Sequence, residues 1–138
     1  MADRRVELIE QGFDAWEHGD IETALTYYHP DVVVYAPPEV GNPGTFHGHE
    51  GFLQWVTAWY EAWDPFEQEL LNIVPVGETH VLALVNQRGT GRGSGVKIER
   101  EATWVFEIRD EQLIYMALYF DNAQAEADAR ERESAAKN

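Results

Sequence analysis

The sequence predicts an α+β domain in which three helices pack on the concave face of a curved antiparallel sheet. In three segments of the first 64 residues, apolar side chains recur every three or four positions, which is typical of amphipathic helices. From residue 66 onward, apolar and polar side chains alternate, which is typical of strands. Short turns separate these later strands, so strands that follow one another in the chain should pair in the sheet.

Three helices are predicted before residue 65. Asp20 is suited to cap the second helix, whose apolar face extends to Tyr28 and which Pro30 stops. The third helix is expected over residues 49–64 and is rich in tryptophan. The apolar stripes of the first and third helices are Val6, Ile9, Phe13 and Trp16, and then Phe52, Trp55, Val56, Trp59 and Trp63.

One short strand is predicted among the helices and four longer strands after them. The short strand covers residues 31–35, and the proline- and glycine-rich loop over 36–48 has the length of a functional lid. The glycine-rich segment 89–95 precedes a strand rather than a helix, so it predicts a hairpin connection and not a phosphate-binding loop. The segment 122–138 has no large apolar residue, and we expect a polar, frayed helix there. The four longer strands are expected at 66–76, 81–88, 96–109 and 113–120.

Composition and charge limit the classes of function. The 138 residues predict a single domain over residues 1–138, and the absence of cysteine excludes disulfides and thiolate metal centres. Acidic residues outnumber basic ones 25 to 10, and a net charge of −15 repels nucleic acids and anionic membranes. No apolar run approaches the roughly 20 residues of a membrane-spanning helix. We therefore expect a cytoplasmic protein whose partner is a small apolar molecule.

Five segments, in their order and spacing, carry a resemblance that covers nearly the whole chain. They are residues 28–34 (YHPDVVV), 44–51 (GTFHGHEG), 86–95 (NQRGTGRGSG), 102–106 (ATWVF) and 119–125 (YFDNAQA). In these segments the chain resembles the SnoaL-like branch of the nuclear-transport-factor-2-like, or ketosteroid-isomerase-like, superfamily. The resemblance implies a cone-shaped, cystatin-like α+β barrel with an apolar cavity, commonly paired into a homodimer through the convex face of the sheet.

Members of this superfamily isomerise, cyclise, dehydrate, hydrolyse epoxides or only bind. Where ketosteroid isomerases carry a catalytic aspartate before a proline, this chain has Ala36. Where limonene-epoxide hydrolases carry an Arg-x-Asp, this chain keeps Arg88 but has Thr90, and Leu118 stands at the second aspartate. Polyketide cyclases of the SnoaL type place an acid–base aspartate near the end of the last strand, and Asp121 is similar in place.

Three residues are candidates for catalysis. Arg88 lies in an otherwise apolar strand, where it can hold a carbonyl or carboxylate in the cavity or can pair with an acid near the strand end. Asp121 can act as a buried base, or it can cap the C-terminal helix, and the cap is the favoured alternative. His47 is a candidate acid–base residue at the cavity mouth. With His49 it forms a His-x-His pair, which is too little for a metal site, so no metal is expected.

Five aromatic residues are candidates for substrate binding: Tyr35, Trp104, Trp55, Trp59 and Tyr119. Buried indole and phenol groups need hydrogen-bond partners, which a ligand-filled cavity can supply. Tyr35 and Trp104 are favoured because one borders the expected lid and the other lies on the apolar face of a central strand.

The functional hypothesis is a cofactor-independent cyclase, isomerase or lyase that moves a proton on an apolar, ring-sized substrate. Asp121 or His47 would move the proton, while Arg88 and a tyrosine would stabilise negative charge on oxygen. The alternative is a module that binds a hydrophobic ligand or only dimerises. A homodimer is expected through the convex sheet face, either through Met116 and Leu118 or through Tyr115 and Tyr119, together with Val105.

Overall fold

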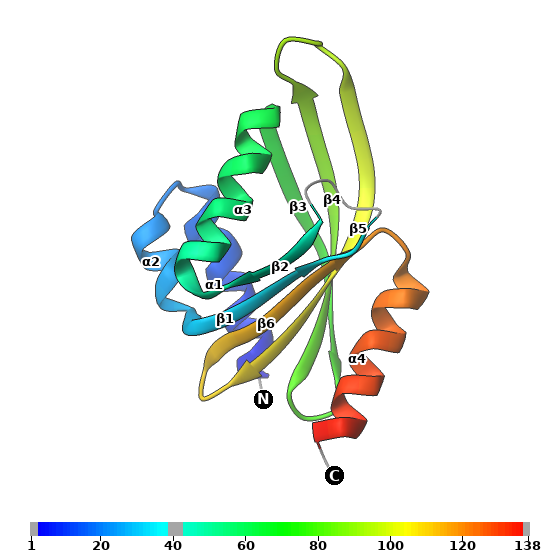
Figure 1. The fold of residues 1–138 in the computed structure, drawn as a ribbon. Helices are drawn as coiled ribbons and strands as arrows, with labels where there is room; N and C mark the ends of the chain where they lie inside the picture. The colour runs from blue at the N-terminus through cyan, green and yellow to red at the C-terminus, as the bar shows by residue number, and fades with distance from the viewer. Residues whose placement is uncertain (1–2, 39–42, 137–138) are drawn as a thin grey trace.

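The computed structural model describes residues 3–38 and 43–136, and Figure 1 shows their arrangement. The helices are α1 (Arg4–Glu17), α2 (Ile21–Thr26), α3 (Gly48–Ala62) and α4 (Asn122–Ala136). The strands are β1 (Tyr28–Ala36), β2 (Gly44–His47), β3 (Trp63–Val76), β4 (His80–Gly91), β5 (Lys97–Arg109) and β6 (Gln112–Tyr119).

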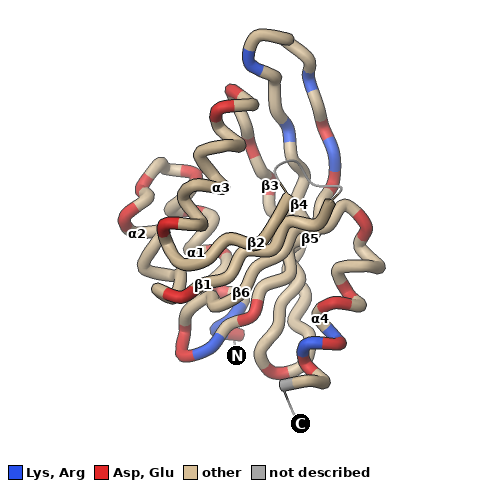
Figure 2. Tube along the Cα trace, viewed as in Figure 1, with Lys and Arg blue, Asp and Glu red and all other residues tan. Residues whose placement is uncertain are grey.

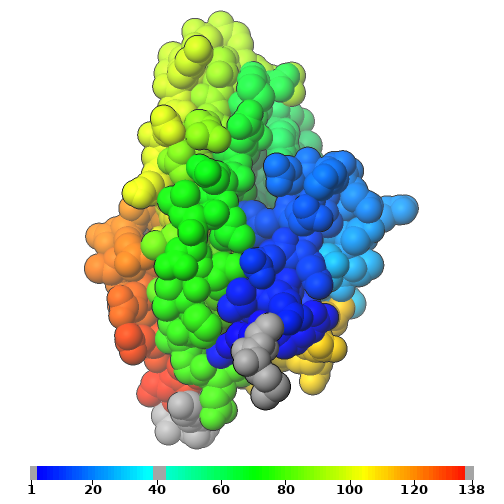
Figure 3. Space-filling model, turned by 180° about the vertical axis from the view of Figure 1, so that it is seen from behind, coloured from blue at the N-terminus to red at the C-terminus, as the bar shows by residue number. Residues whose placement is uncertain are grey.

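The strands form one curved, unclosed sheet in the order β2-β1-β6-β5-β4-β3. The helices α1, α2 and α3 cover one face and α4 the other (Figure 1). The strands β3 to β6 pair with their sequence neighbours in antiparallel fashion, as the short turns predicted. Seen from behind, α1 lies along β3 at the edge of the sheet (Figure 3). The predicted α+β class, with helices on the concave face of a curved sheet, is therefore confirmed.

Three details of the N-terminal half differ from the prediction. Tyr28 begins β1 instead of ending a helix, because α2 is complete at Thr26. Part of the expected loop over 36–48 forms β2, which pairs with β1 through partners such as Val33 and His47. The strand β1 runs parallel to β6, whereas an antiparallel sheet was expected. No short turn joins β1 to β6, so their direction depends on the whole chain between them, which local sequence does not reveal.

The sheet carries two apolar layers because both of its faces are covered. In β5 the alternation places Trp104 and Phe106 toward the helices and Val105 toward α4. The helix α3 contributes a row of rings to the inner layer, and its Phe52 and Trp55 are almost fully buried. Two pairs of β6 residues were candidates for the outer face: Met116 with Leu118, or Tyr115 with Tyr119. Tyr115 belongs to the outer layer, so the second pair faces outward. The remaining β6 side chains divide in the same way, with Met116 and Leu118 inside and Ala117 and Tyr119 outside.

The C-terminal segment differs most from its prediction as a frayed, exposed helix. The helix α4 packs on the outer face of the sheet, with Ala125 and Ala129 fully buried. Small side chains at this four-residue spacing let a helix lie close to the sheet without any large apolar residue. A sequence reading that looks only for large apolar side chains therefore misses this docking.

Candidate ligand-binding cavity

A cavity lies between the inner face of the sheet and the helices α1 and α3. Its volume, as the space open to the centres of water molecules, is about 70 Å³. Its walls are mainly aromatic, and they draw rings from three directions in the fold. The rings include Phe13 and Trp16 of α1, Trp55 and Trp59 of α3, and Phe66 and Trp104 of the sheet.

The cavity has room for only a few water molecules, whereas an engineered cavity that binds benzene measures roughly 150 Å³. A larger depression adjoins it and shares five lining residues: Phe13, Trp16, Tyr60, Phe66 and Gln68. The indole Nε1 of Trp16 donates a 2.9 Å hydrogen bond to the phenol oxygen of Tyr60, and both residues line both spaces. Entry of a ring-sized molecule by this route requires that pair to separate.

A row of polar side chains crosses the inner face of three strands. The backbone register places Gln68 of β3 beside Gln87 of β4, and Gln87 beside Arg100 of β5. Gln68 Oε1 accepts hydrogen bonds from Gln87 Nε2 at 3.0 Å and from Trp104 Nε1 at 2.9 Å. Both glutamines line the cavity, and Gln87 is only 1% exposed. The row gives an otherwise apolar cavity one polar wall.

Several hydrogen-bond donors at the cavity have no partner in the described part of the chain. The indole Nε1 atoms of Trp55 and Trp59 are buried and unpaired. The phenol of Tyr28 also lines the cavity, and burial raises its pKa above the ordinary value, so it stays protonated. An unpaired buried donor costs free energy that an acceptor atom of a ligand would recover. The cavity is therefore suited to a molecule that is mostly apolar and carries oxygen acceptors.

Of the five aromatic residues predicted to bind substrate, three line the cavity: Trp55, Trp59 and Trp104. The other two, Tyr35 and Tyr119, pack against the outer apolar layer instead. Each of the two follows directly after an inward-facing residue of its strand, Val34 or Leu118. Because consecutive side chains of a strand point to opposite faces, Tyr35 and Tyr119 point outward. This corrects the expectation that Tyr35 walls the pocket.

The three predicted catalytic residues do not meet, and none of them lines the cavity, although Arg88 is among the residues that line the adjoining depression. Asp121 is exposed, and its Oδ1 accepts from the backbone N of Ala123 at 2.8 Å, so it caps α4. Arg88 is 46% exposed and lies between two acids of neighbouring strands, 3.6 Å from Glu67 and 3.8 Å from Glu99. His47 is exposed at the start of α3 and makes no capping hydrogen bond with its side chain. The geometry therefore favours the structural alternatives for Asp121 and Arg88.

The residue that the sequence reading missed is Arg100. It has the same alternation as Ala102 and Trp104, so it lies on the inner face. Its Nε donates to Gln87 Oε1 at 3.3 Å. Its guanidinium carbon lies 4.1 Å from the centroid of the Phe120 ring and 5.6 Å from that of Trp59. The sequence contained a signal for Arg100. Every second residue from Ile98 to Ile108 is apolar except Arg100, which therefore occupies a position on the apolar face of the strand.

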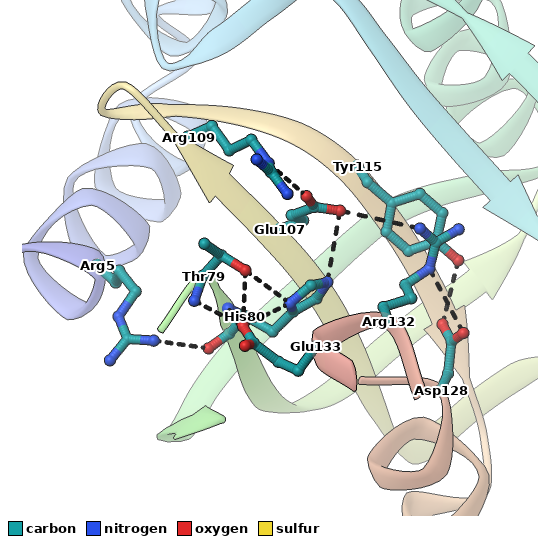
Figure 4. A network of polar contacts seen from close by, with 9 residues as sticks. All are labelled: Arg5, Thr79, His80, Glu107, Arg109, Tyr115, Asp128, Arg132 and Glu133. Atoms are coloured by element: carbon teal, nitrogen blue, oxygen red, sulfur yellow. Dashed lines mark hydrogen bonds and ion pairs between the residues drawn. The ribbon is translucent and has the colours of Figure 1, made fainter. Parts of the chain in front are cut away.

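A second cluster of titratable groups lies on the other face of the sheet, under α4 (Figure 4). His80 is fully buried, with its Nδ1 2.8 Å from Glu133 Oε1 and its Nε2 3.4 Å from Glu107 Oε1. Burial opposes ionisation of Glu133, but hydrogen bonds from Thr79 and His80 outweigh it and lower the pKa of this carboxyl. Gly77 adopts a left-handed backbone here, and a Cβ at this position would collide with the Glu133 carboxylate. The cluster fastens α4 to the β3–β4 turn and has no access to the cavity.

His49, at the start of α3, contacts the backbone of β1. Nε2 of His49 lies at hydrogen-bonding distance, 2.8 Å, from the backbone oxygen of Tyr28.

Over residues 3–38 and 43–136, no group of three or more His, Asp or Glu side chains is placed to hold a metal ion. In the same residues, no helix has the length and apolar character needed to cross a membrane.

A sheet of this curvature, with three helices over its concave face and an aromatic cavity between them, defines a nuclear-transport-factor-2-like fold. The sequence matches the SnoaL-like domain over residues 9–116, and the chain belongs to the SnoaL-like family. The search of curated proteins found no match.

Solved structures share the fold at low sequence identity. One is a nuclear-transport-factor-2-like protein of Burkholderia pseudomallei, with 18% identity and a TM-score of 0.77, covering 89% of this chain and 95% of that one. Another is TerC co-crystallised with polyporic acid, with 20% identity and a TM-score of 0.76, covering 94% and 99%. A third, from Jannaschia sp. CCS1, is assigned as a SnoaL-like polyketide cyclase, with 18% identity and a TM-score of 0.73, covering 92% of both chains. At these identities the likeness establishes the fold alone.

Proposed function

We propose that this protein binds a small, mostly apolar, ring-shaped molecule that carries oxygen acceptors, in the cavity between the sheet and α1 and α3. The observation that carries the proposal is the pair of buried, unpaired indole N–H groups of Trp55 and Trp59 in a cavity walled by rings. Aromatic walls supply apolar contact area, and a few polar groups fix the orientation of a ligand. The row from Gln68 to Gln87 supplies such groups.

The fold relatives are consistent with this use of the cavity. TerC has been crystallised with polyporic acid, a small organic acid by name. Another relative, from Catenulispora acidiphila, is a hypothetical protein solved in complex with trimethylamine. Binding of small organic molecules thus occurs in more than one protein of this fold, and we extend it to this chain.

Binding is tested by ligand-detected ¹⁹F NMR with 4-fluorobenzamide, a neutral ring with a carbonyl acceptor. The native protein should bind it, and Val56→Phe, which places a ring in the cavity wall, should reduce the affinity at least about tenfold. The matched control is Val74→Phe, the same change at a side chain that is 39% exposed. Equal loss in both variants, or no binding to the native protein, would refute the proposal.

A second candidate function is proton transfer on the bound ring, as in the isomerases and cyclases of this superfamily. Tyr28 favours it, because a neutral phenol in an apolar cavity can stabilise developing negative charge on a carbonyl oxygen while the α-proton leaves to water. The test is exchange of the α-hydrogens of 1-indanone in D₂O, followed by NMR. Faster exchange with the native protein than with Tyr28→Phe supports catalysis, and equal rates would restrict the protein to binding.

We also propose that a second copy of the chain covers the part of the outer sheet face that α4 leaves open. Tyr35, Leu84 and Tyr119 are half-buried there and continue the apolar layer beneath α4. Light scattering at micromolar concentration should give the mass of a dimer, and Leu84→Asp should give a monomer. A monomeric native protein would contradict this proposal.

A further inference from the structure

Arg100 differs in its surroundings from Arg88, which lies in the same hairpin. Figure 2 shows basic positions along the β4–β5 hairpin, and five of the ten basic residues of the chain lie there: Arg88, Arg92, Lys97, Arg100 and Arg109. Arg88 lies on the outer face between Glu67 and Glu99. Arg100 lies one strand away on the inner face, half-buried, with its guanidinium over the ring of Phe120.

The guanidinium of Arg100 has no acidic partner within the described part of the chain, although the sequence contains 25 acidic residues. No carboxylate oxygen there lies within 4.0 Å of its nitrogens. Its Nε is bound to Gln87, and its two terminal nitrogens have no hydrogen-bond partner among the same residues. Burial lowers the pKa of this group from its ordinary value, as expected for a charge that no acid compensates. A half-buried, unpaired cation costs free energy that a bound anion would recover.

The side chains that hold Arg100 also form the cavity wall. Gln87, which accepts its Nε–H, and Trp59, whose ring it approaches, both line the cavity. Arg100 itself is not among the residues that line the cavity, so an oxygen acid on a bound ring would meet its terminal nitrogens only where the cavity widens past Gln87 and Trp59. A guanidinium binds a carboxylate through two parallel hydrogen bonds, which also fixes the orientation of the ring.

We propose that Arg100 is the anchor for an anionic oxygen group and that the ligand is a ring-shaped molecule bearing a carboxylate or an acidic enol. This inference rests on the proposed function, because it names the chemical class of the ligand bound in that cavity. The net charge of −15 repels anions from the surface as a whole. A preference for an anionic ligand must therefore arise from a local cation. Arg92 donates to the backbone oxygen of Tyr60, a lining residue, but it is paired with Asp64 at 3.4 Å. Arg100 contacts lining residues and has no acidic partner among the described residues, so it is the cation left free for an anion.

The inference is tested with two probes of nearly the same shape, 4-fluorobenzoate and 4-fluorobenzamide, each titrated by ¹⁹F NMR at pH 7. The native protein should bind the benzoate about tenfold or more tightly than the benzamide, the usual worth of a hydrogen-bonded charge pair. Arg100→Gln should abolish this preference and leave the affinity for the benzamide nearly unchanged. Arg130→Gln, on α4 at the opposite face of the sheet, changes the net charge by the same amount and should keep the preference.

Each result of this experiment supports or overturns a specific statement. Equal affinities in the native protein, or a preference that survives Arg100→Gln, overturn the anchor and leave the binding cavity standing. If neither probe binds the native protein, the proposed function and the anchor both fail. If Arg100→Gln does not fold, the Nε–Hε resonance of Arg100 in the native protein decides, because benzoate should shift it and benzamide should not. The absence of a benzoate-specific shift overturns the anchor.

Discussion

Arg88 and Arg100 lie on adjacent strands of one hairpin and face opposite sides of the sheet. The register pairs Arg88 with Glu99 on the outer face and Gln87 with Arg100 on the inner face. A single step along β4 therefore separates an exposed ion-paired arginine from a position beside the cavity. Arg88 was the arginine predicted from the sequence, because its strand is otherwise apolar. The arginine that lies beside the cavity wall is Arg100, which faces the same side as Trp104 and is hydrogen-bonded to Gln87.

The cap of α4 predicts the effect of changing Asp121. Asp121→Ala should lower the free energy of unfolding by about 1 kcal/mol, whereas Asp121→Asn should lower it by only a few tenths, because asparagine caps a helix nearly as well. Urea denaturation measures both changes. Probe binding should be the same in both variants, and a loss of binding in Asp121→Asn without loss of stability would restore Asp121 as a site residue.

The buried alanines of α4 predict which face of this helix tolerates a larger side chain. Ala129→Leu should lower the free energy of unfolding by about 1–3 kcal/mol, because the added atoms have no room against the sheet. Ala127→Leu is the matched control, since Ala127 is exposed on the same helix. The prediction fails if urea denaturation gives equal stabilities for the two variants.

The carboxyl of Glu133 predicts how stability depends on pH. Its pKa in the folded protein is lowered from the ordinary value of 4.5, so its contribution is complete above that value and is lost as the pH falls below it. Glu133→Gln should cost about 1–3 kcal/mol at pH 7 and should flatten the decline of stability between about pH 4.5 and pH 3. Glu131→Gln, an exposed change on the same helix, should keep the native slope. Parallel pH profiles for all three proteins would contradict this account.

The hydrogen bond between Trp16 and Tyr60 predicts a kinetic effect at the cavity mouth. Tyr60→Phe removes the acceptor of the Trp16 indole and keeps the ring. Because an exposed hydrogen bond contributes about 0.5–1.5 kcal/mol, the association rate constant of 4-fluorobenzamide should rise about two- to tenfold. Line-shape analysis of the ¹⁹F resonance measures this rate. An unchanged rate would place the entrance elsewhere.

Local pattern predicted much of the fold because periodicity reports which side of an element is buried. The tryptophan row predicted for α3 is correct except for Trp63, which begins β3, and the alternation of β5 places its rings correctly. Trp55, Trp59 and Trp104 line the cavity. The pairing of β1 with β6 could not be predicted in the same way, since it depends on contacts between distant parts of the chain.

The candidate site was predicted less well than the fold, for two physical reasons. An aspartate before a helix serves equally as a base or as a cap, and only the hydrogen bond from Ala123 distinguishes the two for Asp121. Whether an arginine faces the inner or the outer side of the sheet depends on its position along the strand. Arg88 and Gln87 are adjacent in β4 and therefore face opposite sides. Residue type therefore indicated that an arginine is used, but only the position along the strand shows which arginine lies beside the cavity.

The most direct test of the account is a crystal structure with 4-bromobenzoate, whose bromine is located by anomalous scattering. The account predicts the ring among Trp55, Trp59 and Trp104, with a carboxylate oxygen at hydrogen-bonding distance, about 2.7–2.9 Å, from a terminal nitrogen of Arg100. The cavity should be wider than in the ligand-free state, because a ring needs more than the present volume of about 70 Å³. A bromine on the outer face of the sheet, beside Arg88 or under α4, with the cavity unchanged, would contradict it.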